Sequence, residues 1–256
     1  MKLSDNTVLI TGGGTGIGYA MAEAFLEAGS TVAICGRKIE RLLEARAKHP
    51  EVYTRACDIA NEEDRKGLVD WTATHLPGLN VLVNNAGVQR DVDFTKGIDD
   101  FLAGENEIRV NLEATIILSG LFVPLLAKNK GPAIVIVSSG LGFVPATRMP
   151  VYSASKAGLH AYSMAIRQQL SKVGIKVFEV VPPAVDTELN PSGRARRGNF
   201  KADLSPKDFV SAVMKDLQND VFEIGYGMTA GLIHASRAGL DKSFAQMNSR
   251  MKASDT

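Results

Sequence analysis

A tyrosine and a lysine four residues apart, Tyr152 and Lys156, are the side chains of this 256-residue sequence best suited to acid–base chemistry. On a helix, that spacing places both side chains on one face. A phenol with an ordinary pKa of about 10 donates a proton at neutral pH, and it acts as a base only beside a cation such as Lys156. Because such pairs also occur in purely structural helices, the interpretation depends on the polar residues around them.

Polar residues that directly follow apolar runs supply these neighbours. Ser139 comes shortly after the apolar run 133–137, and Asn84 follows another run at 80–83. The carboxyl ends of parallel strands meet at one edge of a sheet, and ligands bind there. We therefore expect these polar groups to lie close to the tyrosine–lysine pair.

A glycine-rich turn follows the first apolar run and reads Thr11-Gly12-Gly13-Gly14-Thr15-Gly16-Ile17-Gly18. Glycines allow a tight turn and a close approach to a pyrophosphate, whose charge is stabilised by N–H groups at the start of the next helix. The glycine spacing differs from the G-x-G-x-x-G fingerprint. The turn predicts a dinucleotide site, and a plain strand-to-helix turn is the alternative.

The end of the second strand bears on the choice of cofactor. NAD-binding proteins place an acidic side chain there, on the ribose 2′-OH, whereas this sequence has Cys35-Gly36-Arg37-Lys38. The guanidinium of Arg37 matches a 2′-phosphate. We therefore predict NADP(H) as the preferred cofactor and NAD(H) as the alternative. The competing interpretation of these two cations is a solvated basic helix start.

Alternating strands and helices must position these groups. The strands are predicted at Thr7–Thr11, Thr31–Cys35, Val52–Ala56, Asn80–Val83, Ala133–Val137, Lys176–Val181 and Val221–Gly225, and the helices near 16–28, 38–48, 61–75, 97–129, 152–173 and 205–218. Continuously apolar strands that alternate with helices indicate an α/β fold with a Rossmann-type, doubly wound parallel sheet of about seven strands in a three-layer α/β/α arrangement. We predict a single domain over 1–256, with a substrate loop at about 187–204 and a C-terminal helical tail at about 228–251.

Composition excludes several classes of protein. The chain has 29 Lys+Arg, 28 Asp+Glu and a net charge of +1, which argues against a protein that binds nucleic acid or a membrane surface. No targeting signal or run of about 18 continuous apolar residues stands out. Cys35 and Cys57 are interpreted as reduced, buried thiols of a cytoplasmic protein. The four histidines are scattered, so no metal site is predicted.

Taken together, these motifs resemble the short-chain dehydrogenase/reductase family almost from end to end. The resemblance rests on the Thr11–Gly18 turn, Cys57-Asp58-Ile59, Asn84–Gly87, Asn111, Ser139, Tyr152 thirteen residues later, and Lys156. Within the family, the runs ICGR, LNVLVNNAG, PVYSASKAGLH, PPAVDTELN and FAQMN are most similar to oxidoreductases found beside the genes for D-alanylation of teichoic acid in Gram-positive bacteria.

The resemblance implies catalytic roles for four residues. Tyr152 would be the general acid in carbonyl reduction and the base in alcohol oxidation. Lys156 would favour the phenolate and hold the nicotinamide ribose, and Ser139 would orient the substrate oxygen. Asn111 would hold a water that relays protons through Lys156. Ser139 is preferred to its neighbour Ser138 because the family spacing falls on it.

The resemblance also implies a set of cofactor contacts. Tyr152 and Lys156 contribute to it together with Thr11, Gly12, Gly14, Thr15, Gly16, Ile17, Gly18, Arg37, Asp58, Ile59, Asn84, Ala86, Gly87, Pro182, Val185 and Thr187. One departure is Pro183, where the family usually has a glycine; a second proline removes an N–H, fixes φ and stiffens the backbone of the pocket at this point. Asp58 has a competing interpretation as a helix cap, although Asn61 is better placed for that role.

The resemblance implies that the substrate is a small carbonyl or alcohol compound. Phe143, Val144, Met149 and Leu189 are expected to line its pocket, and Arg194, Arg196, Arg197 and Lys201 either attract an anion or are simply solvated. Relatives are usually homodimers or homotetramers built on the long helices, which we expect here too. The alternative to an enzyme is a catalytically weak or inactive cofactor-binding protein on the same fold.

Overall fold

The computed structural model describes residues 1–190, 193, 202 and 204–236. Within them, seven strands form one parallel sheet in the order β3-β2-β1-β4-β5-β6-β7. The strands are β1 (Thr7–Thr11), β2 (Thr31–Gly36), β3 (Tyr53–Ala56), β4 (Val81–Asn84), β5 (Ala133–Val137), β6 (Lys176–Val181) and β7 (Glu223–Gly225). The predicted doubly wound parallel sheet is confirmed. Its strand order reverses between β1 and β4, where such sheets open a ligand crevice.

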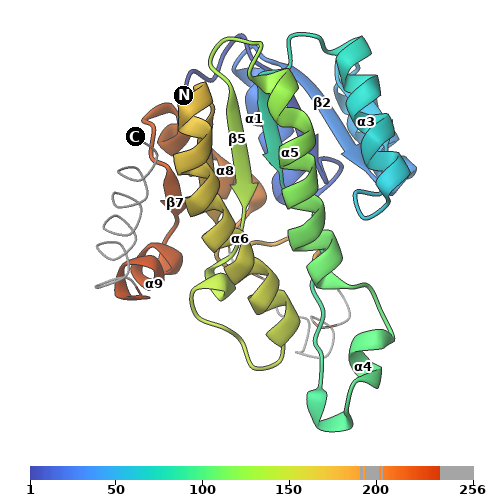
Figure 1. Ribbon diagram of the computed structural model, residues 1–256, viewed down its shortest axis with the longest axis vertical. Coiled ribbons are helices and arrows are strands. Elements are labelled where there is room, and N and C mark those ends of the chain that lie inside the picture. The colour runs from blue at the N-terminus through green and yellow to red at the C-terminus, as the bar shows by residue number, and fades with distance from the viewer. Residues whose placement is uncertain (191–192, 194–201, 203, 237–256) are drawn as a thin grey trace, which may run out of the picture.

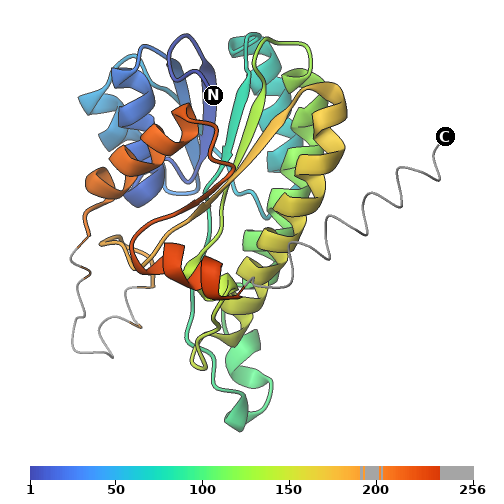
Figure 2. The same cartoon turned by 90° about the vertical axis from the view of Figure 1, so that its left-hand side faces the viewer.

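Helices cover both faces of the sheet, as Figure 2 shows edge-on. The helices are α1 (Gly16–Glu27), α2 (Ile39–Lys48), α3 (Glu62–His75), α4 (Asp99–Leu102), α5 (Ala114–Leu126), α6 (Pro150–Leu170), α8 (Pro206–Gln218) and α9 (Met228–Ser236). Short turns of other helix types are η1 (Phe94–Lys96), η2 (Ile108–Glu113), η3 (Gly140–Gly142) and η4 (Ser171–Val173). The predicted tail helix begins at Met228 as α9, and its continuation over 237–251 lies outside the described residues.

Alternate residues of each central strand face opposite layers of helices. Val8 and Ile10 of β1 pack with Phe25 of α1 in one core, and Leu9 packs with Phe122 of α5 in the other. All five side chains are fully buried. In Figure 1, α3, α5 and α6 lie in front of the sheet, and α1 and α8 lie behind it. This two-sided burial explains why the strands are continuously apolar in sequence.

The prediction of one helix over 97–129 is wrong, because the chain first forms a projecting arm that carries η1 and α4 (Figure 1). Gly97 adopts a φ of +82°, which ends η1. The guanidinium of Arg90 donates to three backbone carbonyls within 100–105, at 2.6, 3.0 and 3.2 Å. Helix formation resumes after Asn106, whose side chain accepts from the backbone two and three residues later. A side chain from outside the segment therefore interrupts a locally helical pattern.

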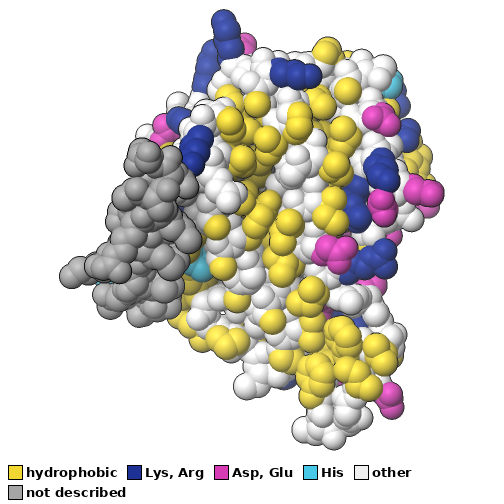
Figure 3. Space-filling view, in the orientation of Figure 1, with side chains coloured by type: hydrophobic (Ala, Val, Ile, Leu, Met, Phe, Trp, Pro, Cys, Tyr) yellow, Lys and Arg dark blue, Asp and Glu magenta, His cyan; other side chains and the backbone are white. Residues whose placement is uncertain are grey.

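The front face of the molecule is rich in apolar side chains (Figure 3). The segment Ile108–Leu126, which joins η2 to α5, is long and apolar enough to cross a membrane by length and composition alone. Its inner side chains, such as Leu118, are fully buried in the core behind it, so it serves as a core helix. On its outer face, Ile116 is 39% exposed and Leu121 is 36% exposed.

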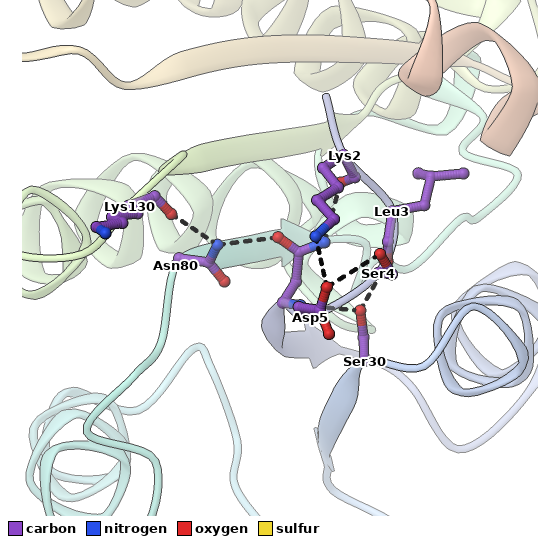
Figure 4. Close-up of polar contacts among 8 residues, drawn as sticks. Lys2, Leu3, Ser4, Asp5, Ser30, Asn80 and Lys130 are labelled. Atoms are coloured by element: carbon purple, nitrogen blue, oxygen red, sulfur yellow. Dashed lines mark hydrogen bonds and ion pairs between the residues drawn. The ribbon is translucent and has the colours of Figure 1, made fainter.

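The amino end of the sheet is closed by polar contacts (Figure 4). The side-chain amide of Asn80 donates to Asn6 Oδ1 at 2.9 Å and to the carbonyl of Lys130 at 3.0 Å. The hydroxyl of Ser30 donates to the carbonyl of Leu3 at 2.7 Å. These bonds join the chain segments that enter β1, β2, β4 and β5, and they leave the opposite end of the sheet for a ligand.

Candidate active site

A cavity of about 700 Å³ opens at the carboxyl end of the sheet, a size typical of small-molecule sites. Most of the predicted site residues line it. They are Gly12, Gly14, Thr15, Gly16, Ile17, Arg37, Asp58, Ile59, Ala86, Gly87, Ser139, Tyr152, Lys156, Pro182, Val185 and Thr187. The topology thus brings together residues from distant parts of the chain, from Gly12 to Thr187.

The glycine-rich turn forms one wall of this cavity. Gly12 and Gly16 have φ angles of +65° and +57°, which a side chain would strain. Gly18 lies behind the wall, where a Cβ would stand 2.4 Å from the carbonyl oxygen of Gly12. Thr15 begins α1 without a side-chain cap, and the first turn carries no acidic residue. The first N–H groups of α1 therefore suit a phosphate anion.

Thr11 and Asn84, two predicted cofactor residues, stand behind the cavity wall rather than on it. The hydroxyl of Thr11 accepts from the backbone N–H groups of Asn85 and Ala86 at 3.0 and 3.1 Å. The amide of the buried Asn84 donates to Ser119 Oγ at 3.0 Å. Thr11 thus fixes the backbone after β4 against the glycine-rich turn, and Asn84 ties the end of β4 to α5.

Two ion pairs lie at the end of the cavity next to β2. Arg37 forms a hydrogen-bonded ion pair with Glu105, and Arg41 contacts Glu188 at 2.6 Å. The hydrogen bond to Glu105 raises the pKa of Arg37, so that this side chain is a cation at any physiological pH. Cationic groups are therefore present where the sequence predicts a phosphate.

Asp58 lines the cavity and does not cap the following helix. Asn61 takes the cap position of α3, and its Oδ1 accepts from the N–H of Asp64 at 3.0 Å. Within the described part of the chain, the Asp58 carboxylate accepts one hydrogen bond, from the N–H of Ala60 two residues later, at 2.9 Å. The competing interpretation of Asp58 as the helix cap is thus wrong.

Ser139, Tyr152 and Lys156 converge at the inner end of the cavity. Ser139 caps η3 and accepts from the N–H of Leu141 at 3.2 Å. Tyr152 and Lys156 lie in the first two turns of α6 and are only 5% and 4% exposed. The Lys156 ammonium lies 5.7 Å from the centre of the Tyr152 ring, and it donates to the carbonyl of Val137 at 2.8 Å.

Burial governs the protonation of this group. Burial raises the pKa of Tyr152 to about 12. A hydrogen bond with Ser139 lowers this pKa, and the negative charge of Glu107 raises it further. Burial lowers the pKa of Lys156 to about 8, and Glu179 opposes that change. Tyr152 is therefore a protonated phenol at neutral pH, which suits proton donation.

Asn111 lies behind the cavity in η2, a π-helical turn of the kind that recurs at functional sites. Its Oδ1 accepts from the N–H of Val88 at 2.8 Å, and its Nδ2 donates to Ser155 Oγ at 3.0 Å. A Cβ on Gly87 would stand 3.1 Å from Asn111 Oδ1 and 3.7 Å from Lys156 Nζ. Asn111 thus ties the segment after β4 to α6, beside Lys156.

The apolar lining differs in part from the prediction. Met149 and Leu189 line the cavity, but Phe143 and Val144 do not. Phe143 instead places its ring 4.5 Å from that of His160. The predicted cation cluster of Arg194, Arg196, Arg197 and Lys201 lies outside the described residues.

Two buried carboxylates near the site do not figure in the sequence analysis. Glu107 Oε1 accepts from the N–H of Arg90 at 2.9 Å, while its buried Oε2 has no hydrogen-bond partner within the described part of the chain. Glu179 lies inside β6 and accepts from Ser138 Oγ at 2.6 Å. Both serines line the cavity, but the hydroxyl of Ser138 is engaged by this carboxylate, which favours Ser139 as the serine for the substrate oxygen. A glutamate within the apolar run 176–181 is a visible sequence signal for such a site.

The site and the fold define a dinucleotide-binding oxidoreductase of the α/β class. A family model described as short chain dehydrogenase matches residues 6–198. The chain belongs to the short-chain dehydrogenase/reductase family, whose members are NAD(P)-dependent enzymes.

Two bacterial relatives cover most of the chain. The uncharacterized oxidoreductase DltE of Bacillus subtilis is 43% identical over 250 residues, which cover 98% of this chain and 99% of DltE. An uncharacterized oxidoreductase of Staphylococcus saprophyticus is 31% identical and covers 85% of this chain and 93% of its own. The resemblance drawn from the sequence motifs is confirmed.

Solved structures share the fold. A short chain dehydrogenase from Burkholderia cenocepacia in complex with NADP superposes with a TM-score of 0.79 at 27% identity, covering 96% of this chain and 98% of that one. A short chain dehydrogenase/reductase from Burkholderia phymatum in complex with NAD has a TM-score of 0.81 at 19% identity and covers 96% of both chains. At that lower identity the likeness concerns the fold alone.

Proposed function

We propose that the protein is an NADP(H)-dependent oxidoreductase that interconverts a small carbonyl compound and its alcohol by hydride transfer. The observation that carries this proposal is the convergence of Ser139, Tyr152 and Lys156 at one end of a cavity whose wall is the glycine-rich turn. A proton donor and a dinucleotide cradle thus share one space.

The residues present fit the cofactor. The uncapped start of α1 would hold the pyrophosphate, and Arg37 would pair with a 2′-phosphate. Pro182, Val185 and Thr187 would border the nicotinamide, although Pro183 offers no N–H there. When bound, the reduced cofactor supplies the hydride. The NADP in the Burkholderia cenocepacia relative supports this choice, and NAD(H) is the alternative.

Tyr152 would act as the general acid in carbonyl reduction. Its phenol is protonated at neutral pH, and the proton passes from Oη to the substrate oxygen as that oxygen gains charge. Ser139, next to Tyr152, would hold the same oxygen by a hydrogen bond. Lys156 would hold the ribose hydroxyls and restore the proton, and Asn111 behind it would support the water that relays protons from solvent.

A panel of aldehydes and ketones, followed by the loss of NADPH absorbance, tests this function. We expect turnover of at least one compound, with NADPH preferred to NADH. Failure with every compound, together with unchanged cofactor binding in Tyr152→Phe, would instead favour a non-catalytic cofactor-binding protein.

The assembly and location of the enzyme complete the proposal. The apolar outer face of α5, with Ile116 and Leu121, supports a homodimer or homotetramer built on α5 and α6. The thiols of Cys35 and Cys57, which form no disulfide, suit the reducing cytoplasm. Light scattering checks the assembly, and a purely monomeric protein would contradict it.

A further inference from the structure

A buried carboxylate that the proposed mechanism does not use lies behind the active site. Glu179 is fully buried in β6, between apolar strand residues. Its Oε1 accepts from Ser138 Oγ at 2.6 Å, and its Oε2 accepts from His160 Nδ1 at 2.8 Å and from Ser163 Oγ at 3.0 Å. Burying a charged side chain costs free energy, which hydrogen bonds and a charge partner only offset. A core of apolar side chains at this place would avoid that cost.

The partners of Glu179 belong to the elements that carry the active site. Ser138 directly precedes Ser139, and His160 stands one helical turn after Lys156 on α6. Phe143, at the end of η3, places its ring 4.5 Å from that of His160. A Cβ on Gly142 would stand 2.8 Å from the backbone of Lys156, so η3 packs directly on α6. The carboxylate therefore joins the end of β5 to the helix.

Glu179 and the Lys156 ammonium meet the same stretch of β5. Val137, whose carbonyl accepts from Lys156 Nζ at 2.8 Å, directly precedes Ser138, which donates to Glu179, so the carboxylate acts on the charge of Lys156. Burial raises the pKa of Glu179, but the hydrogen bond and charge of His160, with the two serine bonds, lower it below its ordinary value. The side chain is therefore ionised at neutral pH. Its negative charge opposes the burial that lowers the pKa of Lys156 to about 8.

Other charged groups surround Glu179 within the described part of the chain. On α6 these are the cations Lys156 and Arg167, the second of which donates to the carbonyl of Val177 at 2.8 Å, together with the titratable imidazole of His160. On β7, the carboxylate of Glu223 lies within 4.8 Å of the facing atoms of His160 and Glu179. The carboxylate that shifts the pKa of Lys156 is Glu179, so Glu223 provides a matched control in the same cluster.

We propose that Glu179 is a positioning residue that keeps Lys156 charged and holds the end of β5 against α6. The carboxylate charge performs the first part, and the hydrogen bond to Ser138 performs the second. This role rests on the proposed function, because it takes the Lys156 ammonium as the group that holds the cofactor ribose.

Replacing the charge alone tests the first part. NADPH affinity, measured by fluorescence titration across neutral and alkaline pH, should fall in the wild type as Lys156 loses its proton near pH 8. In Glu179→Gln the pH at which NADPH affinity falls, called the pH break, should move about one unit lower, because one nearby negative charge is removed. Glu223→Gln should keep the wild-type break. A break in Glu179→Gln at the wild-type pH would overturn the proposal.

A second measurement separates this inference from the proposed function. Competitive labelling of the Lys156 amine, read by peptide mass spectrometry, follows the same proton without a cofactor. If the wild type binds neither NADPH nor NADH, the proposed function fails, and the labelling still decides the role of Glu179. A lower labelling pKa in Glu179→Gln supports that role, and an equal one overturns it.

Ser138→Ala tests the second part of the proposal, the tether between the end of β5 and α6. It also keeps the proposal testable if the Glu179→Gln variant does not fold. The substitution removes the 2.6 Å hydrogen bond but leaves the carboxylate charged. We expect turnover of the best carbonyl substrate to fall about tenfold, the value of one buried hydrogen bond, with the pH break unmoved. Wild-type turnover in Ser138→Ala would overturn the tether between β5 and α6.

Discussion

Lys156 donates a hydrogen bond from Nζ to the carbonyl oxygen of Val137 at 2.8 Å, which fastens α6 to the last residue of β5. Ser139 stands two residues beyond Val137, and Tyr152 stands one turn before Lys156. A single ammonium thus fixes the separation of the two hydroxyl groups that would meet the substrate oxygen. Changes to any of these side chains should therefore affect rate and binding in different proportions.

Tyr152→Phe should remove the proton donor and leave the shape of the site intact. We expect kcat to fall about 10²- to 10⁴-fold, with NADPH affinity nearly unchanged. Steady-state kinetics and fluorescence titration measure the two effects. Tyr162→Phe is the matched control on the same helix, because its hydroxyl contacts the Ile116 carbonyl at 3.5 Å and Ser119, and Tyr162 does not line the cavity. A Tyr152→Phe enzyme with wild-type turnover would refute the assigned role.

Lys156→Ala should lower the rate and cofactor affinity together. The substitution removes the cation beside Tyr152, the contact to the ribose and the bond to Val137. NADPH titration of the variant, alongside kcat on the same substrate, checks both effects. An effect on the rate alone would show that Lys156 does not hold the ribose.

The pH dependence of carbonyl reduction should follow Lys156 rather than Tyr152. Lys156, with its pKa lowered to about 8, is charged below that pH and neutral above it, whereas Tyr152 stays protonated up to about pH 12. The kcat/KM for NADPH should therefore be flat below about pH 7 and decline through pH 8. A rate that declines only near pH 10 would contradict this order.

Arg37→Gln should weaken NADPH selectively. Loss of a charged hydrogen bond at this exposed site should raise the KM for NADPH about tenfold and leave that for NADH nearly unchanged. Glu105→Gln should act in the opposite direction, because it frees Arg37 from its ion pair. Arg46→Gln, in the last turn of α2, is the control. A preference for NADH in the wild type would exclude the 2′-phosphate contact.

Two glycine substitutions should have opposite effects on stability. A Cβ at Gly18 would stand 2.4 Å from the Gly12 carbonyl oxygen, so Gly18→Ala should lower stability by about 1–3 kcal/mol and disturb cofactor binding. Gly67→Ala, inside α3, meets only the side chain of Arg55 at 3.8 Å and should raise stability by about 0.5–1 kcal/mol. Thermal unfolding with and without NADPH measures both. Equal melting temperatures would contradict the crowding at Gly18.

Local patterns were sufficient for most of the fold. The runs Thr7–Thr11, Ala133–Val137 and Lys176–Val181 match β1, β5 and β6 at both ends, because strands buried on both faces need continuous apolar sequence. The helix predicted over 97–129 failed because Arg90 competes for its carbonyls from outside the segment. Periodicity does not register such a contact.

The site was only partly predictable for a related reason. Motif spacing identified Ser139, Tyr152 and Lys156 because each lies at a fixed point on a strand end or helix. Glu107 and Glu179 escaped notice, since their effect depends on burial and on partners such as His160 that lie elsewhere in the chain. The charge of a buried group is a property of the assembled core.

The ion pair between Arg37 and Glu105 has a consequence for ligand discrimination. Glu105 is a tethered competitor, present at a high and constant effective concentration beside the guanidinium. A phosphate must outcompete this carboxylate, whereas a ribose hydroxyl need not disturb it. The apparent affinity for a phosphorylated ligand is therefore lower than its intrinsic affinity, in proportion to the fraction of Arg37 side chains that are paired with Glu105. Natural variation at position 105 would then tune how strongly the enzyme favours one nicotinamide pool over the other.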